Sequence, residues 1–577
     1  MSIPSLPAGS PDAFARVASN QPFILMDATA AWPLQAQLTD GGADAEPSVS
    51  EAALRAMFGE TTAPVAAAAA AAAAAEYGAE RASVPFGEYL DGWRRGSAES
   101  SVDGTDTLGS ESTAPTAGGE PGAGAGYLKD FHFCLQRPEA EALYALPPPF
   151  ADDWLNAWSL AGGRALADSS SASGAEAAAP AAPAAPDDYR FLYLGPKGSA
   201  TPPHFDVLCS CSWSAQLAGR KRWQLREHEG VGEWSTVVQP PRSVMFVPSG
   251  WEHSVENLQD SLSINHNWFG KAAVGRCWAF LRAEAAATVA MLGQFEAEMD
   301  AEGPRVWVEH VVKVERANAG LSRRDLAELL LMQPGAEEAR AILRELLEPL
   351  HARFLTADQL QRAKAAIIGR GLKLNAQLDD VPRERLRMRL ADDARPPPAV
   401  ALPSGFALVQ FGTVPAATAA SWAAVCAAAG EMGGDVAALS ARFASEFGSG
   451  EKAEADLAAR MFFALDAAGA AVGTATAWRD DGQAGGGRVH WVSVAPSAQG
   501  QGLAKALMAA VLRKLRELHP PPLPIGLSTQ TTSARAIVMY LQLGFAPAPL
   551  GGKGGELSAE EASGWRALQK LFGVPLL

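Results

Sequence analysis

Three residues that could bind a metal ion stand out in the first half of the chain. His204 and Asp206 lie two residues apart in the motif HFD, and His253 closes the segment VPSGWEH. Side chains at positions i and i+2 of a strand point to the same face, so a strand here would direct an imidazole and a carboxylate together. Two histidines and one carboxylate leave half of an octahedral ion open, as in non-haem iron(II) oxygenases. HFD alone favours the simpler interpretation, a core histidine beside an aspartate.

The residues around this motif favour an active site over a core histidine. Lys221 follows in GRKRW and could pair with a dicarboxylate. Thr201 lies just before the candidate ligands and could donate a hydroxyl, and Asn265 lies on the strand expected after His253.

The segments TPPHFD, SWSAQLAGRKRW and VPSGWEHSVENLQDSLSINHNWF resemble the Jumonji-C family, and within it the lysyl hydroxylases of the translation termination factor. The likeness covers most of the first 270 residues. It implies a double-stranded β-helix (jelly-roll, cupin-like) that binds Fe(II), 2-oxoglutarate and O₂. It also implies that His204, Asp206 and His253 bind the metal, that Lys221 binds the distal carboxylate of 2-oxoglutarate, and that Thr201 and Asn265 contact this co-substrate.

The resemblance implies a protein substrate, with the translation termination factor as a candidate. Between Trp223 and Gln239 the chain is shorter than its relatives, which leaves the target open. Two alternatives remain: a Jumonji-C part that only docks proteins, and a histone lysine demethylase. The complete set of candidate ligands together with Lys221 argues against a docking module.

A second candidate site lies in the last third of the chain, in SVAPSAQGQGLAKALMAAVL. Its small residues would let backbone N–H groups at a helix N-terminus approach phosphate oxygens. A plain turn between a strand and a helix explains the motif equally well. With GTATAW before it and TSARAIVMYLQLGF after it, this part resembles the GNAT superfamily of N-acetyltransferases over roughly residues 405–560.

The GNAT resemblance implies acetyl-CoA as co-substrate. It assigns the pyrophosphate to the amides of Gln499, Gly500, Gly502 and Ala504, the pantetheine arm to the backbone of Val492 and Val494, and protonation of the leaving thiolate to Tyr540. Two departures concern catalysis: Ser533 replaces the usual asparagine, and the expected strand Val489–Val494 carries no acidic residue. His490 could act as the base there, but it could equally be structural.

Periodicity predicts the elements that hold both sites. Between residues 189 and 269, short aromatic and aliphatic runs separated by turn residues predict many short strands. Three- and four-residue spacing predicts helices from Lys271 to about Asp393, with the basic cluster Arg383–Arg389 on a solvated helix face. We therefore expect a mixed fold with four parts: an oxygenase domain at 1–275 with inserts at about 60–76, 96–126 and 169–188, a helical extension at 276–394, a linker at 395–404, and an α/β GNAT domain at 405–577.

Composition restricts the partners. The net charge of -16 over 577 residues argues against nucleic acid or an anionic membrane as the main partner. The five cysteines form no CxxC pair, which favours a reducing compartment. The N-terminus has no secretory signal pattern. We expect a soluble protein of the cytoplasm, with the nucleus as an alternative. The oligomeric state is not indicated.

Overall fold

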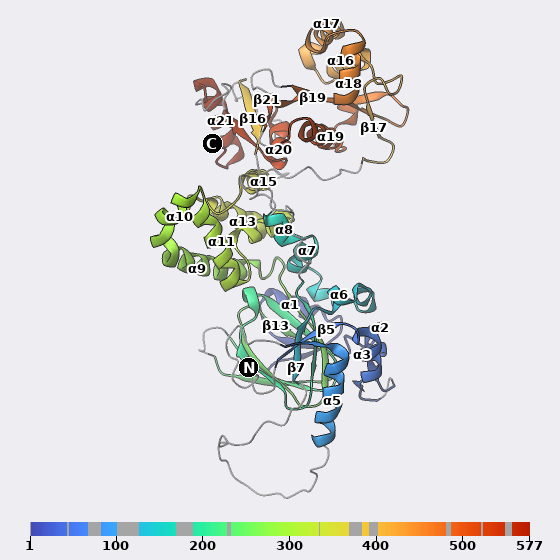
Figure 1. The fold of residues 1–577 in the computed structure, drawn as a ribbon, viewed down its shortest axis with the longest axis vertical. Coiled ribbons are helices and arrows are strands. Elements are labelled where there is room, and N and C mark those ends of the chain that lie inside the picture. Colours follow the sequence, from blue (N-terminus) through green and yellow to red (C-terminus); the bar gives the residue numbers. More distant parts are fainter. Residues whose placement is uncertain are drawn as a thin grey trace, which may run out of the picture. The chain divides into compact units, whose positions relative to one another are not determined.

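The computed structural model describes residues 2–42, 45–66, 82–100, 126–168, 188–227, 232–333, 335–368, 383–391, 402–479, 486–520, 523–548 and 557–577. Most of the three predicted inserts and of the linker at 395–404 lies outside these ranges. The chain divides into two compact units, which Figure 1 shows in sequence colours. The first unit is Met1–Ala165 with Pro180–Ile342, and the second is Leu166–Ala179 with Leu343–Leu577.

The first unit is built on two sheets. In spatial order, the larger has nine strands: β1 (Ser5–Pro7), β2 (Phe23–Met26), β13 (Ser243–Val247), β10 (Cys211–Ala218), β15 (Ser261–Trp268), β8 (Arg190–Gly195), β7 (Tyr127–Phe131), β5 (Thr62–Ala66) and β6 (Ala82–Pro85). The smaller has four: β12 (Ser235–Gln239), β11 (Lys221–Arg226), β14 (Glu252–Asn257) and β9 (Ala200–His204). A short pair, β3 (Thr39–Asp40) and β4 (Ser48–Val49), stands apart.

One apolar core joins the two sheets. Ile24 and Met245 of the larger sheet pack in the same cluster as Trp223, Leu225 and Val255 of the smaller one. Along β11, buried and exposed residues alternate, as expected for a strand with one face in the core. The same alternation on β14 directs His253, Val255 and Asn257 inward. The side chains of these three residues therefore lie in the interior between the two sheets.

Two groups of helices lie before β8 and after β15 in the chain. Those before β8 are α1 (Pro11–Ala18), α2 (Pro33–Leu38), α3 (Glu51–Phe58), α5 (Phe86–Ser100), α6 (Phe133–Gln136), α7 (Trp154–Leu160) and α8 (Gly163–Asp168). After β15 come α9 (Val274–Leu292), α10 (Glu296–Glu302), α11 (Val306–Ala319), α12 (Arg323–Leu331), α13 (Glu337–Leu346), α14 (Pro349–Ala352) and α15 (Ala357–Ile368). Within the described residues, no helix is both long and apolar enough to cross a membrane.

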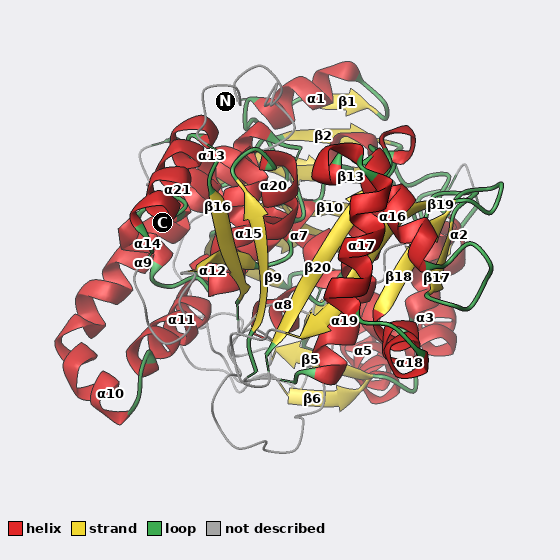
Figure 2. Cartoon of the chain, turned by 90° about the horizontal axis from the view of Figure 1, so that it is seen from above, coloured by secondary structure: helices red, strands yellow, loops and turns green. Residues whose placement is uncertain are grey.

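The second unit holds a seven-stranded sheet. Some of its strands, drawn in yellow, are labelled in Figure 2. In spatial order the strands are β17 (Ala407–Gln410), β18 (Met461–Leu465), β19 (Ala471–Arg479), β20 (Gly487–Val494), β21 (Ile525–Gln530), β16 (Arg385–Leu390) and β22 (Phe545–Ala548). The helices that follow β16 in the chain are α16 (Ala419–Ala428), α17 (Val436–Phe447), α18 (Glu451–Arg460), α19 (Leu503–Leu518), α20 (Ala534–Gln542) and α21 (Ala559–Phe572), and α14 and α15 also belong to this unit.

The predicted helix over Arg383–Arg389 is wrong, because Arg385–Leu390 forms strand β16. This strand pairs antiparallel with β21 on one side and with β22 on the other. Its sequence RLRMRL alternates: Leu386, Met388 and Leu390 are buried, and Arg385 and Arg389 are exposed. A period of two is the pattern of a strand. The expectation of a helix relied on the density of charge and overlooked this alternation.

Candidate metal centre and acetyl-CoA site

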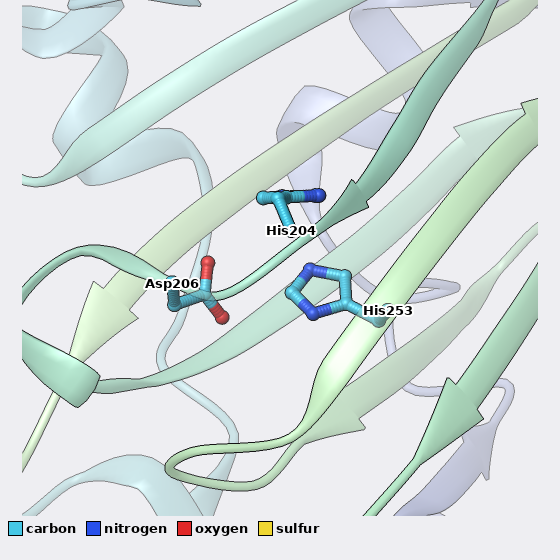
Figure 3. A group of neighbouring side chains, drawn as sticks. All are labelled: His204, Asp206 and His253. Atoms are coloured by element: carbon cyan, nitrogen blue, oxygen red, sulfur yellow. The ribbon is translucent and has the colours of Figure 1, made fainter. Parts of the chain in front are cut away.

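Neighbouring strands of the smaller sheet bring the candidate metal ligands together. His204 ends β9 and lies directly opposite His253 of β14 in the antiparallel ladder. Side chains of directly opposed residues lie close on one face of a sheet. Asp206 follows β9 in an extended conformation, with φ −65° and ψ 146°. The three side chains turn toward one another, and one ligand atom of each lies within 4.8 Å of the other two (Figure 3).

Backbone carbonyl groups orient both imidazoles. His204 Nδ1 lies 2.9 Å from the Pro202 carbonyl oxygen, and His253 Nδ1 lies 3.2 Å from that of Trp251. A proton on each Nδ1 would make these contacts hydrogen bonds and leave Nε2 to bind a metal, as in many histidine ligands. Burial and the neighbouring His204 lower the pKa of His253 to about 4, so its imidazole is neutral near pH 7. The neutral form is the one that coordinates metals.

The carboxylate of Asp206 also fits a cation. Its Oδ2 is buried and has no hydrogen-bond partner among the described residues. A buried carboxylate oxygen without a partner costs free energy unless a cation compensates for it. Two imidazoles and one carboxylate therefore form a donor set that suits a divalent transition-metal ion.

Lys221 reaches into the same interior from β11. It is 1% exposed, and its Nζ donates to Ser263 Oγ of the larger sheet at 2.6 Å. Ser263 Oγ in turn donates to Asn265 Oδ1 at 3.0 Å, which also accepts from Ser214 Oγ. Burial lowers the pKa of Lys221 to about 7. A buried lysine that donates to a neutral hydroxyl, with a second cation, Lys129, close enough to lower its pKa further, is suited to pair with an incoming anion.

The sequence did not point to two tyrosines of this region: Tyr193, which lies beside Lys221, and Tyr127, whose ring packs against that of Tyr193. The Nζ of Lys221 lies 5.8 Å from the ring centre of Tyr193, whose hydroxyl donates to Asp130 at 2.6 Å. Burial raises the pKa of Tyr127, while hydrogen bonds from Asn257 and Thr201 oppose that rise. The structure therefore places Thr201 within this polar group. Ser263 could have been found from the sequence, because it lies two residues before Asn265 and so on the same face of β15.

The candidate phosphate-binding loop lies between β20 and α19. Gly500 and Gly502 have φ +77° and +84°, and Gly502 is the N-cap of α19. The N–H groups in the first turn of a helix have no intrahelical acceptor, which leaves that of Ala504 available to an anion. The N–H of Gln499, by contrast, donates to the Pro496 carbonyl at 3.3 Å within the turn.

Tyr540 lies on α20 and is 8% exposed. Burial, with a smaller contribution from Glu431, raises the pKa of its hydroxyl to about 12. The hydroxyl is therefore protonated at neutral pH and can give up a proton. Val492 and Val494 lie on β20, whose ladder with β21 contains only Gly487 and Arg488.

Comparisons with known proteins give relatives for each half of the chain. The 2-oxoglutarate and iron-dependent oxygenase JMJD4 of Danio rerio is 28% identical over 305 residues, covering 47% of this chain and 60% of that protein. JMJD4 of Gallus gallus is 32% identical, covering 42% of this chain and 54% of that protein. The arginine-specific demethylase JMJ20 of Arabidopsis thaliana is 36% identical, covering 27% and 38% respectively. The chain thus spans 60% or less of the length of these relatives.

Residues 437–545 match the model of the acetyltransferase (GNAT) family. A crystal structure of a GCN5-related N-acetyltransferase from Sphaerobacter thermophilus matches 29% of this chain and 49% of that chain at 22% identity, with a TM-score of 0.23. Both resemblances inferred from the sequence are confirmed: the N-terminal part is similar to JMJD4 oxygenases, and the C-terminal part contains a GNAT-family segment.

Proposed function

We propose that the first unit is an iron(II)- and 2-oxoglutarate-dependent oxygenase that hydroxylates a protein. The observation that carries this proposal is the convergence of His204, Asp206 and His253, with a buried and unpartnered carboxylate oxygen on Asp206. The JMJD4 relatives are named as 2-oxoglutarate and iron-dependent oxygenases, and this supports iron as the metal and 2-oxoglutarate as the co-substrate. Iron with 2-oxoglutarate and O₂ would supply the oxidising chemistry that side chains lack.

The chain's own residues would bind and orient the reactants. Lys221, once protonated, would pair with the distal carboxylate of 2-oxoglutarate, with Ser263, Asn265 and Thr201 close to it. The core between the two sheets would keep water from the reacting centre. We also propose that these two sheets form the double-stranded β-helix implied by the Jumonji-C resemblance. The order β12-β11-β14-β9 opposite β2-β13-β10-β15-β8 supports this arrangement.

For the substrate we propose a lysine side chain of a protein, with the translation termination factor as the first candidate. The test is to incubate the full chain with Fe(II), 2-oxoglutarate and this factor, and to measure succinate together with the intact mass of the factor. A gain of one oxygen atom that is absent with the His253→Ala variant would support hydroxylation. Glu256→Ala, an exposed change on the same strand, should behave like wild type.

The same experiment separates the alternatives. JMJ20 is named an arginine-specific demethylase, so methylated peptides belong in the assay. Loss of a methyl group with release of formaldehyde would replace hydroxylation by demethylation. Absence of succinate under every condition, with the substrate still bound, would leave only a docking module.

We propose that the second unit transfers the acetyl group of acetyl-CoA to an amine. The match of residues 437–545 to the GNAT family carries this second activity. The amides of Gly500, Gly502 and Ala504 would hold the pyrophosphate, while the amide of Gln499 supports the turn itself. The backbone of Val492 and Val494 would pair with the pantetheine arm, and Tyr540 would protonate the leaving sulfur.

The test of acetyl transfer measures free CoA thiol released from acetyl-CoA in the presence of amines. Tyr540→Phe should lower kcat by roughly 100-fold, the lower end of the range for general acid catalysis. Its dissociation constant for acetyl-CoA should stay at the wild-type value, since the phenol is assigned no binding role. An unchanged kcat would remove Tyr540 from the reaction. The proposed location is the cytoplasm, where both co-substrates are present.

A further inference from the structure

Strand β20 stops pairing with its parallel neighbour β21 two residues before His490. Its pairing with β21 contains only Gly487 with Ile525 and Arg488 with Gly526. On its other side, the register with β19 shifts between Thr474 and Thr476. Trp491 lies at this shift with φ +49°, a value that is rare for a bulky residue. A bulge of this kind bends a strand and redirects its side chains, and such bulges often lie beside active sites.

His490 forms a close pair with a carboxylate that follows no sequence motif. Its Nε2 lies 2.7 Å from Glu446 Oε1, a residue of α17 that is 44 positions away in sequence. The two side chains are 16% and 14% exposed, so both are largely removed from water. Because an ionised carboxylate can only accept hydrogen bonds, Nε2 carries the proton and Nδ1 keeps a lone pair.

Two arginines hold this pair in place. Arg442 Nη2 lies 2.5 Å from Glu446 Oε2, and Arg488 Nη2 lies 3.5 Å from Glu446 Oε1. Burial, together with Arg488 and Arg442, lowers the pKa of His490 to about 4, and Glu446 opposes that change. The imidazole is thus neutral at physiological pH, in the form that can accept a proton.

Aromatic side chains surround the pair. The rings of Phe447 and Trp491 lie 5.8 and 5.9 Å from the His490 ring, and Trp422 lies 5.0 Å from Trp491. The indole Nε1 atoms of Trp422 and Trp491 are buried and have no hydrogen-bond partner among the described residues. These rings pack in one apolar cluster and shield the pair from water. The two indole N–H groups could donate to a polar group of an amine substrate.

We propose that His490 is the general base of acetyl transfer and that Glu446 is its positioning residue. The inference rests on the proposed acetyltransferase activity and names the base that the strand's sequence left open. A primary amine would attack the thioester carbonyl, so that a C–N bond forms and the C–S bond breaks. His490 Nδ1 takes the proton from nitrogen, and Tyr540 gives its proton to sulfur. Solvent then carries the proton from His490 to Tyr540. The products are an amide and CoA thiol.

The experiment uses the full chain, acetyl-CoA and three amine probes: spermidine, a lysine-containing peptide and a peptide with a free N-terminus. His490→Gln should lower kcat/KM by roughly 100- to 1,000-fold for whichever amine is accepted, within the range for a general base. The affinity for acetyl-CoA should remain as in wild type. Glu446→Gln should give a smaller loss in kcat, and Glu454→Gln, an exposed change of the same type on α18, should give none.

Chemical rescue separates a catalytic role from a structural one. Activity of His490→Gly should rise with the concentration of added imidazole, since a small base can occupy the space of the deleted ring. Loss without rescue and with a lowered Tm would assign His490 a structural role and overturn the proposal. Acetyl transfer at the wild-type rate by His490→Gln would overturn the roles of His490 and Glu446 but would still support the acetyltransferase activity. Acetyl-CoA binding without transfer to any probe would overturn both the dyad and the transfer.

Discussion

The two candidate sites differ in the atoms that would bind their ligands. The candidate metal centre of the first unit consists of side chains: two imidazoles and a carboxylate, with Lys221 reaching in from a neighbouring strand. The candidate acetyl-CoA loop of the second unit consists of backbone, with two glycines at positive φ before the first turn of α19. A side-chain site is lost when a single functional group is removed. A backbone site tolerates changes of exposed side chains but not changes of conformation.

The largest expected effect is the removal of a metal ligand. His204→Ala should abolish succinate formation and lower metal affinity by more than roughly 100-fold, because loss of an outer-sphere partner alone costs up to that amount. Metal binding by calorimetry and succinate production test this. Release of CoA from acetyl-CoA should be unchanged in the same protein. A variant with wild-type turnover of 2-oxoglutarate would remove His204 from the site.

The next effect tests whether the two units are stabilised separately. Met388 of β16 is fully buried, and Met388→Ala should lower the free energy of unfolding by about 2–5 kcal/mol. We expect the lower Tm in the thermal transition whose midpoint is raised by acetyl-CoA, because β16 belongs to the seven-stranded sheet of the second unit. The Tm of the other transition, which metal and a 2-oxoglutarate analogue raise, should not change. An unchanged Tm of the acetyl-CoA-dependent transition would contradict the contribution of β16 to the stability of the second unit.

Lys221 provides a smaller effect with a defined pH dependence. Lys221→Met should weaken 2-oxoglutarate binding by roughly 10- to 150-fold, the equivalent of about 1.5–3 kcal/mol for a hydrogen bond to a charged group. In the wild type, affinity should fall as pH rises above about 7, because the free amine loses its proton there. Binding above that pH should take up a proton, which calorimetry in buffers of different ionisation enthalpy detects. A pH-independent affinity with no proton uptake would contradict this assignment.

The same lowered pKa affects stability without ligand. The pKa of Lys221 is lower in the folded state than in the unfolded state, so the unfolded chain binds more protons between the two values. Its contribution to the free energy of unfolding should therefore increase as pH rises from about 7 toward the ordinary lysine range. Chemical denaturation of wild type and Lys221→Met across this range isolates the contribution.

The smallest effect tests the backbone site. Gly502→Val should weaken acetyl-CoA binding by several-fold, because a β-branched residue at φ +84° costs about 1–2 kcal/mol or more. Gln501→Ala, an exposed change in the adjacent position, should leave affinity within about twofold, since surface changes are usually within ±0.5 kcal/mol. Comparable losses in both variants would show that side chains contribute more to this loop than its geometry indicates.

The sequence alone determined the residues of both sites that lie within motifs. HFD and VPSGWEH identified His204, Asp206 and His253, and the glycines of QGQGLA identified the loop before α19. Both depend on local spacing, which a strand or a turn converts into a defined direction. The predicted roles of Lys221, Asn265 and Tyr540 came from family resemblance; in the structure Lys221 and Tyr540 are buried, and Asn265 is half-buried and accepts a hydrogen bond from Ser263.

Only the tertiary structure decided which distant residues meet. Glu446 of α17 approaches His490 of β20 because α16 packs against both elements, and no spacing within either element predicts that contact. Ser263 meets Lys221 because two sheets share one core, and β16 joins the seven-stranded sheet of the second unit from a segment well before the residues that match the GNAT family. In each case the partners come from elements far apart in sequence. Local patterns set the direction of a side chain, but packing between elements sets what it faces.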